Sequence, residues 1–145
     1  MAVFLVECDT ALAPVEAWRR VTAWERHDGT VPLTRVTVGT PPPTGVGTVV
    51  VARTGLGRAR FADPMRVAVW EPPAGAGGSG HCRLEKAGRV VAGWAEIDVR
   101  PHGAGASVRW REDLRLRGLP RAFDAPTRWA ARLVFRRVVA TLLAD

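Results

Sequence analysis

The sequence lacks the residues and spacings that mark most metal sites and disulfide-bonded domains. Its two cysteines, Cys8 and Cys82, do not form a CxxC pair, so they predict neither a disulfide framework nor a zinc site. His27, His81 and His102 lie in or beside expected turns, and no two of them have metal-ligand spacing. We therefore expect no metal and no cofactor.

Long apolar runs and targeting signals are missing as well. No segment approaches ~18 consecutive apolar residues, so we expect no membrane span. The opening residues MAVFLVECD have no basic region and only a short apolar run, which argues against a signal peptide and for a cytoplasmic location. The segment TGLGRA at residues 54–59 lacks the full GxGxxG pattern, and no strong helix follows it, so a nucleotide-binding loop is not expected.

Acidic residues are outnumbered, and the formal net charge is +7 with a pI near 11.3. Every basic residue except Lys86 is arginine, and alanine, valine, glycine and proline are abundant, which is typical of a GC-rich coding bias. Several acidic residues also lie close to the arginines. We therefore expect no nucleic-acid partner, although a basic module for an acidic partner stays as a third hypothesis.

The residues that are present predict one α+β domain over residues 1–145. Hydrophobic residues make up 47% and charged residues 24%, as in ordinary soluble domains, and a chain of this length buries about two-thirds of its unfolded surface. A short helix is expected from Pro14 and a long one over the C-terminal residues, with Pro126 in its first turn. Strands are expected at 2–9, 33–38, 46–53, 65–70, 81–86, 89–99 and 106–117, and residues 53–64 are expected to form a loop or irregular hairpin end.

The C-terminal helix has one apolar stripe. Its residues follow the i, i+3, i+4, i+7, i+11 spacing of an amphipathic helix: Ala131, Val134, Phe135, Val138 and Leu142. A single helix cannot bury its own stripe, so we expect a curved sheet to cover it. Arg128, Arg132 and Arg136 follow another side and are expected to face solvent.

Residues 107–117 alternate with period 2, which predicts a strand with one buried face. Val108, Trp110, Leu114 and Leu116 share that face with one carboxylate, Glu112. Burial would raise the pKa of Glu112, so it could act as an acid, a base or an anchor for a bound hydroxyl. The alternatives are that a bulge turns Glu112 outward or that an arginine pairs with it at a cavity mouth.

Two hairpins suggest a register for the neighbouring strands. A two-residue turn at Ala87-Gly88 would pair Cys82 with Gly93, and a five-residue loop at 101–105 would pair Gly93 with Glu112. These three residues would then form one row across the inner face, and the small Gly93 and Ala95 would leave room for a ligand or water. On the outer face, the same register sets Glu96 opposite Arg109 and Trp94 opposite Arg111.

Several segments together resemble a known superfamily. DPMRVAVWEPP, AGRVVAGWAEIDV, GAGASVRWREDLRL and the helix from Arg121 resemble the START-like or SRPBCC superfamily, the helix-grip proteins that include the birch-pollen allergen. The bacterial branch labelled polyketide cyclase/dehydrase or lipid-transport-like is the most similar. The resemblance implies a seven-stranded curved antiparallel sheet wrapped around a long C-terminal helix, one or two short helices after the first strand, and a cavity between sheet and helix.

This resemblance implies binding of a small hydrophobic molecule such as a lipid or polyketide, by a monomer or homodimer. The expected ligand-binding residues are Met65, Val67, Cys82, Leu84, Val91, Gly93, Ala95, Trp110, Leu114, Trp129 and Leu133. The alternative is a polyketide cyclase/dehydrase-type enzyme with Glu112 as its catalytic acid or base. Aromatic-polyketide cyclases rely on pocket arginines, tyrosines or other polar residues; this chain has no tyrosine, and most of its strand arginines fall on the expected outer face.

Overall fold

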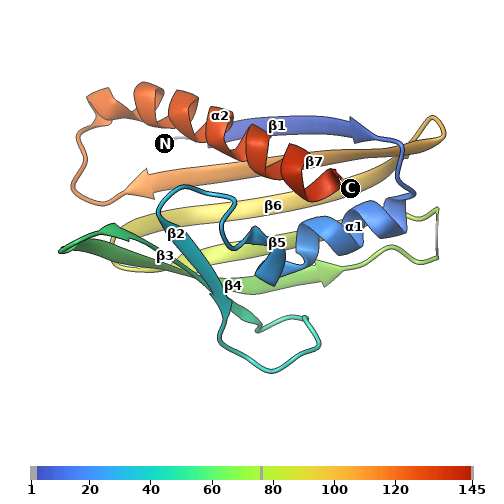
Figure 1. The fold of residues 1–145 in the computed structure, drawn as a ribbon, viewed down its shortest axis with the longest axis horizontal. Coiled ribbons are helices and arrows are strands. Elements are labelled where there is room, and N and C mark those ends of the chain that lie inside the picture. The colour runs from blue at the N-terminus through green and yellow to red at the C-terminus, as the bar shows by residue number, and fades with distance from the viewer. Residues whose placement is uncertain (1–2, 76, 145) are drawn as a thin grey trace.

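Residues 3–75 and 77–144, which the computed structural model describes, form one curled antiparallel sheet with helices on its concave side (Figure 1). The strands are β1 (Val3–Thr10), β2 (Thr34–Val38), β3 (Val49–Leu56), β4 (Ala59–Glu71), β5 (Gly80–Ala87), β6 (Val91–His102) and β7 (Gly105–Leu116). The helices are α1 (Pro14–Thr22) and α2 (Asp124–Leu143), with short 3-10 helices η1 (Trp24–His27) and η2 (Arg121–Phe123).

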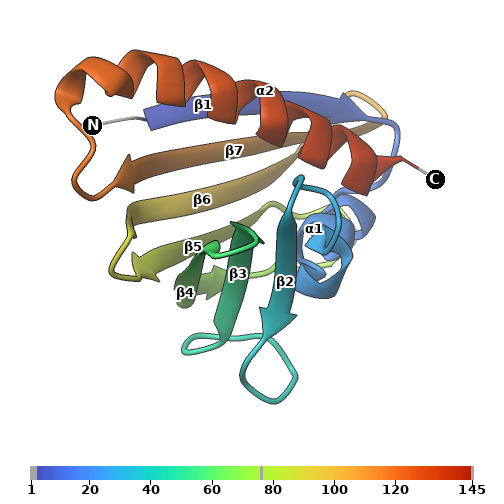
Figure 2. The same cartoon turned by 60° about the vertical axis from the view of Figure 1, so that its left-hand side comes forward.

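The strand order in the sheet is β1-β7-β6-β5-β4-β3-β2, so strands that are neighbours in sequence are neighbours in space, except that β1 and β2 form the two opposite edges. Helix α2 packs mainly on β1, and α1 packs against β5, β6, β7 and α2. Figure 2 shows β2 and β3 running across the direction of β5, β6 and β7, which gives the sheet its strong curl. The fold expected from the sequence, including the seven strands and the C-terminal helix, is confirmed.

The apolar stripe of α2 faces the sheet as its spacing predicts. Ala131, Val138 and Leu142 are buried, and Val134 and Phe135 pack against the core while partly exposed. The Phe135 ring lies 5.4 Å from the ring centroids of Phe4 on β1 and of Trp110 on β7. These aromatic contacts fix the helix over the strands that carry the inward-facing residues.

The stretch 53–64, expected to be a loop, is instead the end of a long hairpin. β3 continues to Leu56 and β4 begins at Ala59, and these two residues pair across a two-residue turn. Gly57 has φ +61°, a left-handed conformation that a glycine adopts without steric cost. The glycines that suggested a loop therefore make the tight turn, and the strands on either side bring new inward-facing residues into the sheet.

Both predicted hairpin registers are wrong by an even number of residues. Lys86, rather than Cys82, lies opposite Gly93, because β5 and β6 are joined by a longer turn than Ala87-Gly88. A side chain at Gly88 would lie 2.9 Å from the Cδ of Pro64, so this glycine serves close packing and not a two-residue turn. Between β6 and β7 the turn is shorter than expected, with His102 paired to Gly105, so Ala95, rather than Gly93, lies opposite Glu112.

Even shifts preserve which face of the sheet each residue occupies, because side chains alternate with period 2. The inner-face residues were therefore predicted correctly, while their neighbours were not. On the outer face, Glu96 pairs with Arg111 and not with Arg109, at 3.2 Å. Trp94 lies opposite Asp113 rather than Arg111, but the Arg111 guanidinium still lies over the Trp94 ring at 5.8 Å, and Arg83 lies over the same ring at 4.8 Å.

A buried cavity and its polar groups

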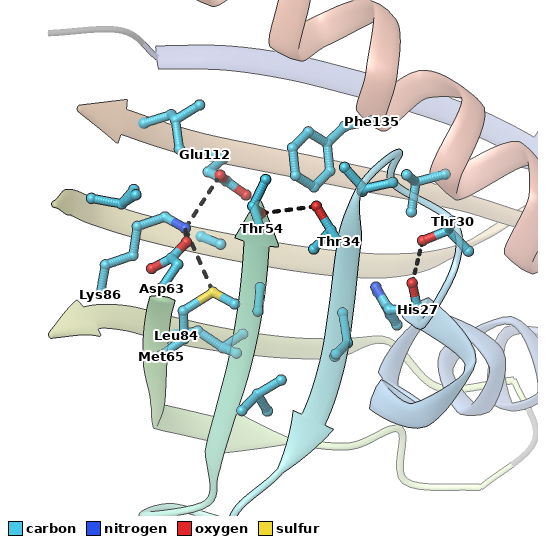
Figure 3. A pocket seen from close by; sticks show the side chains of 18 of the residues that line it. His27, Thr30, Thr34, Thr54, Asp63, Met65, Leu84, Lys86, Glu112 and Phe135 are labelled. Carbon is cyan, nitrogen blue, oxygen red and sulfur yellow. Dashed lines mark hydrogen bonds and ion pairs between the residues drawn. The ribbon is translucent and has the colours of Figure 1, made fainter. Parts of the chain in front are cut away.

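A cavity of about 270 Å³ lies between the concave face of the sheet and α2 (Figure 3). Apolar side chains make up most of its wall, and a few polar groups are set among them. The lining residues are Trp24, His27, Thr30, Val31, Thr34, Val36, Val50, Ala52, Thr54, Phe61, Asp63, Met65, Leu84, Lys86, Val91, Ala95, Trp110, Glu112, Leu114, Leu116, Phe135 and Val138. A concave apolar site with a few convergent polar groups is the usual form of a small-molecule site.

The cavity approaches the outer surface beside β2 and β3. Val31, Thr34, Thr54 and Phe61 line both the cavity and an open cleft on the outside of this part of the molecule. The segment between η1 and β2 and the tip of the β3–β4 hairpin border this cleft. The cavity and the cleft are therefore neighbours that share part of one wall.

Most residues expected to bind a ligand line the cavity: Met65, Leu84, Val91, Ala95, Trp110 and Leu114, together with Glu112. Val67 and Cys82 do not, because they are fully buried in the hydrophobic core. Cys82 lies opposite Ile97 and Trp70 in the corrected register, away from the cavity wall. Burial raises its pKa to about 12, so it remains a thiol at neutral pH.

Trp129 and Leu133 are on the outside of α2 and cannot line the cavity. Their exposed fractions are 68% and 45%. They lie two residues from Ala131, which is buried, and from Phe135, which packs against the core, and two residues correspond to about 200° of rotation in an α-helix. The stripe that places Ala131 inside therefore places Trp129 and Leu133 outside.

Gly93, which was expected to bind a ligand, does not line the cavity, and its role is in the packing of the strands. Its φ is +127°, and a Cβ there would lie 1.9 Å from the carbonyl oxygen of Asp113 on β7. The residue must therefore be glycine for β6 and β7 to approach each other. Because Gly93 has no side chain and Ala95 has a small one, little side-chain volume covers the inner face of β6. Side chains from β5 and β7 can therefore meet across this strand.

Glu112 is directed into the cavity with 2% exposure, as the alternation of β7 predicts. Its Oε1 accepts a hydrogen bond of 3.1 Å from the indole Nε1 of Trp110, two residues away on the same face. Its Oε2 is buried and makes no hydrogen bond with the described residues. Burial raises the pKa of Glu112, since desolvation disfavours the carboxylate more than nearby Lys86 favours it.

Lys86 and Asp63 meet Glu112 in the cavity and form with it a cluster, here called the carboxyl cluster (Asp63, Lys86 and Glu112; Figure 3). The Nζ of Lys86 lies 2.6 Å from Oδ2 of Asp63 and 3.5 Å from Oε2 of Glu112. It also lies 3.5 Å from Sδ of Met65. The Lys86 side chain is 2% exposed, so this is a buried ion pair with a second carboxyl beside it.

The charge state of Lys86 decides which chemistry it can perform. Burial acts to lower its pKa, but the charges of Glu112 and Asp63 outweigh burial and raise it. Lys86 is therefore held as an ammonium ion and is not a free amine nucleophile at neutral pH. It can stabilise negative charge or hold Glu112 in place.

Lys86 and Asp63 were missed in the sequence for different reasons. Lys86 has the same period-2 parity as Leu84, so a sheet argument extended by two residues would have placed it on the inner face. Asp63 was hidden because its segment was expected to be a loop. Alternation of Phe61, Asp63 and Met65 along β4 was the available signal.

Figure 3 shows a second polar group on the opposite side of the cavity, formed by His27 and Thr30, with Thr34 and Thr54 between it and the carboxyl cluster. The hydroxyls of Thr34 and Thr54 lie 2.8 Å apart. His27 is buried, and its Nε2 donates to the backbone oxygen of Val21 at 2.8 Å. Burial lowers the pKa of His27, so its ring is neutral at neutral pH.

The described residues contain no group of three or more His, Cys, Asp or Glu side chains arranged to hold a metal ion. No helix in the described part of the chain is long and apolar enough to cross a membrane.

A curved antiparallel sheet, a long C-terminal helix and a cavity between them define the helix-grip fold. Comparison with protein-family profiles found no match, and comparison with curated protein sequences found none. Comparison with solved structures shows the fold. The crystal structure of Ara h 8.0201 matches with a TM-score of 0.64 and 11% identity over 99% of this chain and 98% of that one.

Two further structures have the same fold. The solution structure of the KanY protein matches with a TM-score of 0.68 and 15% identity, over 97% of this chain and 94% of that one. The crystal structure of BexL, a di-domain ARO/CYC from the BE-7585A biosynthetic pathway, matches with a TM-score of 0.63 and 16% identity. That match covers 99% of this chain but 45% of BexL, so this chain corresponds to about half of the di-domain protein.

Proposed function

We propose that this protein binds a small hydrophobic molecule in the cavity, with Glu112 orienting one polar group of the ligand. The observation that carries the proposal is the buried Oε2 of Glu112, which faces a largely apolar cavity, makes no hydrogen bond with the described residues and has the Lys86 ammonium 3.5 Å away. A buried polar atom without a partner costs about 1–3 kcal/mol, and a bound ligand would recover part of that cost. Apolar burial at ~25 cal/mol per Å² would supply most of the affinity.

The size of the cavity limits the ligand. A volume of about 270 Å³ is less than twice the ~150 Å³ of an apolar cavity that holds one benzene molecule. The proposal is therefore a ligand of about two fused rings. A four-ring polyketide or an intact phospholipid would have to extend through the cleft beside β2 and β3.

The test is calorimetric titration of 1-tetralone, a two-ring ketone, into the native protein and two matched variants. Ala95→Leu places a larger side chain in the cavity, opposite Glu112. Ala92→Leu makes the same change on the outer face of the same strand. We expect binding to native protein and Ala92→Leu, and at least tenfold weaker binding to Ala95→Leu. Equal binding by both variants would place the ketone outside the cavity.

A second candidate is an enzyme of the cyclase/dehydrase type with Glu112 as general acid or base. Its raised pKa and the adjacent ammonium of Lys86 favour this candidate, because a buried acid can give a proton to a substrate oxygen. Turnover of a poly-β-keto substrate by native protein and Glu112→Gln tests it. Loss of roughly 100-fold or more in rate supports the role, and an unchanged rate removes Glu112 from the mechanism.

A further inference from the structure

The cavity has hydrogen-bonding groups at two places, and the two places need opposite partners. One is the carboxyl cluster, and the other is the pair of hydroxyls of Thr34 and Thr54, with His27 beyond them (Figure 3). Both threonines line the cavity, and Thr34 is 9% exposed. The sequence gives no signal for this second place, because Thr34 and Thr54 lie on strands 20 residues apart.

The hydrogens at the threonine pair can be accounted for in two ways. If Thr34 donates to the backbone oxygen of Pro32 at 3.2 Å, then Thr54 donates to Thr34, and Thr54 keeps only an accepting lone pair for a ligand. If Thr34 donates to Thr54 at 2.8 Å, the hydroxyl hydrogen of Thr54 is available. A ligand hydroxyl satisfies both arrangements because it can donate and accept.

His27 is a second reason to expect a hydrogen-bond donor on the ligand near Thr34 and Thr54. Its Nε2 carries the hydrogen that bonds to the oxygen of Val21, since a carbonyl can only accept. In the neutral ring the other nitrogen, Nδ1, is therefore an acceptor. A carbonyl placed beside Nδ1 would set two acceptors against each other, whereas a hydroxyl placed there can donate to Nδ1.

The carboxyl cluster needs the opposite partner. The hydrogens of Lys86 Nζ are directed to Asp63, to Met65 and toward Oε2 of Glu112. Burial raises the pKa of Glu112, which favours its protonated form, and because Oε1 accepts from Trp110 the proton in that form lies on Oε2. That proton has no acceptor among the described residues. A ligand oxygen that accepts, such as a ketone, fits there.

We propose that the cavity selects a two-ring molecule carrying a carbonyl oxygen for Glu112 and, at its other end, a hydroxyl for the Thr34–Thr54 pair. This inference rests on the proposed function, since it names the class of ligand that the same cavity takes. The chemical class is a small hydroxylated ring ketone. Neither polar group adds much size, so the ligand still fits the volume argued above.

The test uses four probes that differ only in these two groups: tetralin, 1-tetralone, 5,6,7,8-tetrahydro-2-naphthol and 6-hydroxy-1-tetralone. Affinities are measured by calorimetry for native protein, Thr54→Val and the double variant Thr34→Val/Thr54→Val. The control is Thr37→Val, which removes an exposed hydroxyl from the same strand, β2, where it accepts from Arg53. Valine has the shape of threonine, so the cavity keeps its volume.

In native protein and Thr37→Val, we expect 6-hydroxy-1-tetralone to bind tightest, with each polar group improving affinity by roughly fivefold. The hydroxyl advantage should disappear in the double variant, while the ketone advantage remains. Binding of all four probes with equal affinity would overturn this inference and leave the proposed function standing. Absence of binding by every probe, in folded native protein, would overturn both. A hydroxyl advantage that survives in the double variant would show that the threonine pair does not recognise it.

Discussion

Removal of the ammonium from the carboxyl cluster is the perturbation with the largest expected effect on stability. Lys86→Met keeps the apolar stem and removes the charge, leaving Asp63 and Glu112 buried without their cation. The Lys86 side chain is 2% exposed and its Nζ lies 2.6 Å from Asp63, so little solvent can replace it. Breaking a buried ion pair on one side costs about 3–5 kcal/mol, and we expect Lys86→Met to lose that much free energy of unfolding at pH 7.

Replacement of the whole cluster should behave differently. In Asp63→Leu/Lys86→Met/Glu112→Leu no charge is left uncompensated, and apolar side chains of similar size can fill the space. Such replacements are often neutral or stabilising by about 1–4 kcal/mol. Glu112→Leu also leaves the buried Nε1 of Trp110 without its acceptor, which costs about 1–3 kcal/mol. We therefore expect the triple variant to be more stable than Lys86→Met and within about 2 kcal/mol of the native protein, while losing the preference for ligands with a carbonyl. The cluster would then be needed for binding and not for folding.

The assay is urea unfolding at pH 7 and again at acidic pH. Acid should reduce the deficit of Lys86→Met, because protonation of Glu112, whose pKa burial raises, removes one of the uncompensated charges. Arg89→Met, which removes an exposed cation from the neighbouring turn, is the control and should change stability by no more than about 0.5 kcal/mol. A Lys86→Met protein within about 1 kcal/mol of native at pH 7 would refute the reasoning, since it would mean that the cluster is effectively solvated.

Three further predictions concern single residues. The free energy of unfolding of native protein relative to Glu112→Gln should be constant below the ordinary carboxyl pKa of 4.5 and should fall as pH rises through the raised pKa of folded Glu112. Urea unfolding from pH 4 to 9 measures this difference. A difference that does not change with pH would contradict burial of the acid. Gly93→Ala should lose more than about 2 kcal/mol of free energy of unfolding, because the φ of Gly93 is +127° and a Cβ would clash with the carbonyl oxygen of Asp113. Native stability in urea unfolding would contradict the close approach of β6 and β7. In the native protein a thiol reagent should leave Cys82 unmodified and react slowly with the partly exposed Cys8, whose pKa burial also raises; rapid labelling of both would contradict this arrangement.

The fold could be predicted because its signals are local and repeated. Period-2 alternation in residues 107–117 and the helical stripe around Ala131 and Val138 each determine one buried face. Errors in turn length shifted the registers by even numbers of residues, and even shifts leave the inner face unchanged. Glu112 could be placed inside for that reason.

The partners of Glu112 could not be predicted, because they depend on turns. The length of the β5–β6 turn decides whether Cys82 or Lys86 lies opposite Gly93. That length depends on tertiary packing at the turn, such as the packing of Gly88 on Pro64. The glycines around residue 57 gave the same signal for a loop as for a tight hairpin. Long-range packing, rather than local pattern, therefore assembles the carboxyl cluster and the threonine pair.

Contact between a bound ligand and the cavity wall tests the central claim most directly. Isotope-filtered NOE spectra of the labelled protein with 6-hydroxy-1-tetralone should show contacts from the ligand rings to the methyl groups of Leu84 and Val50, which line the cavity. NOEs to the exposed Trp129 and Leu133 on the outside of α2, with none to Leu84 or Val50, would contradict a ligand site between sheet and helix.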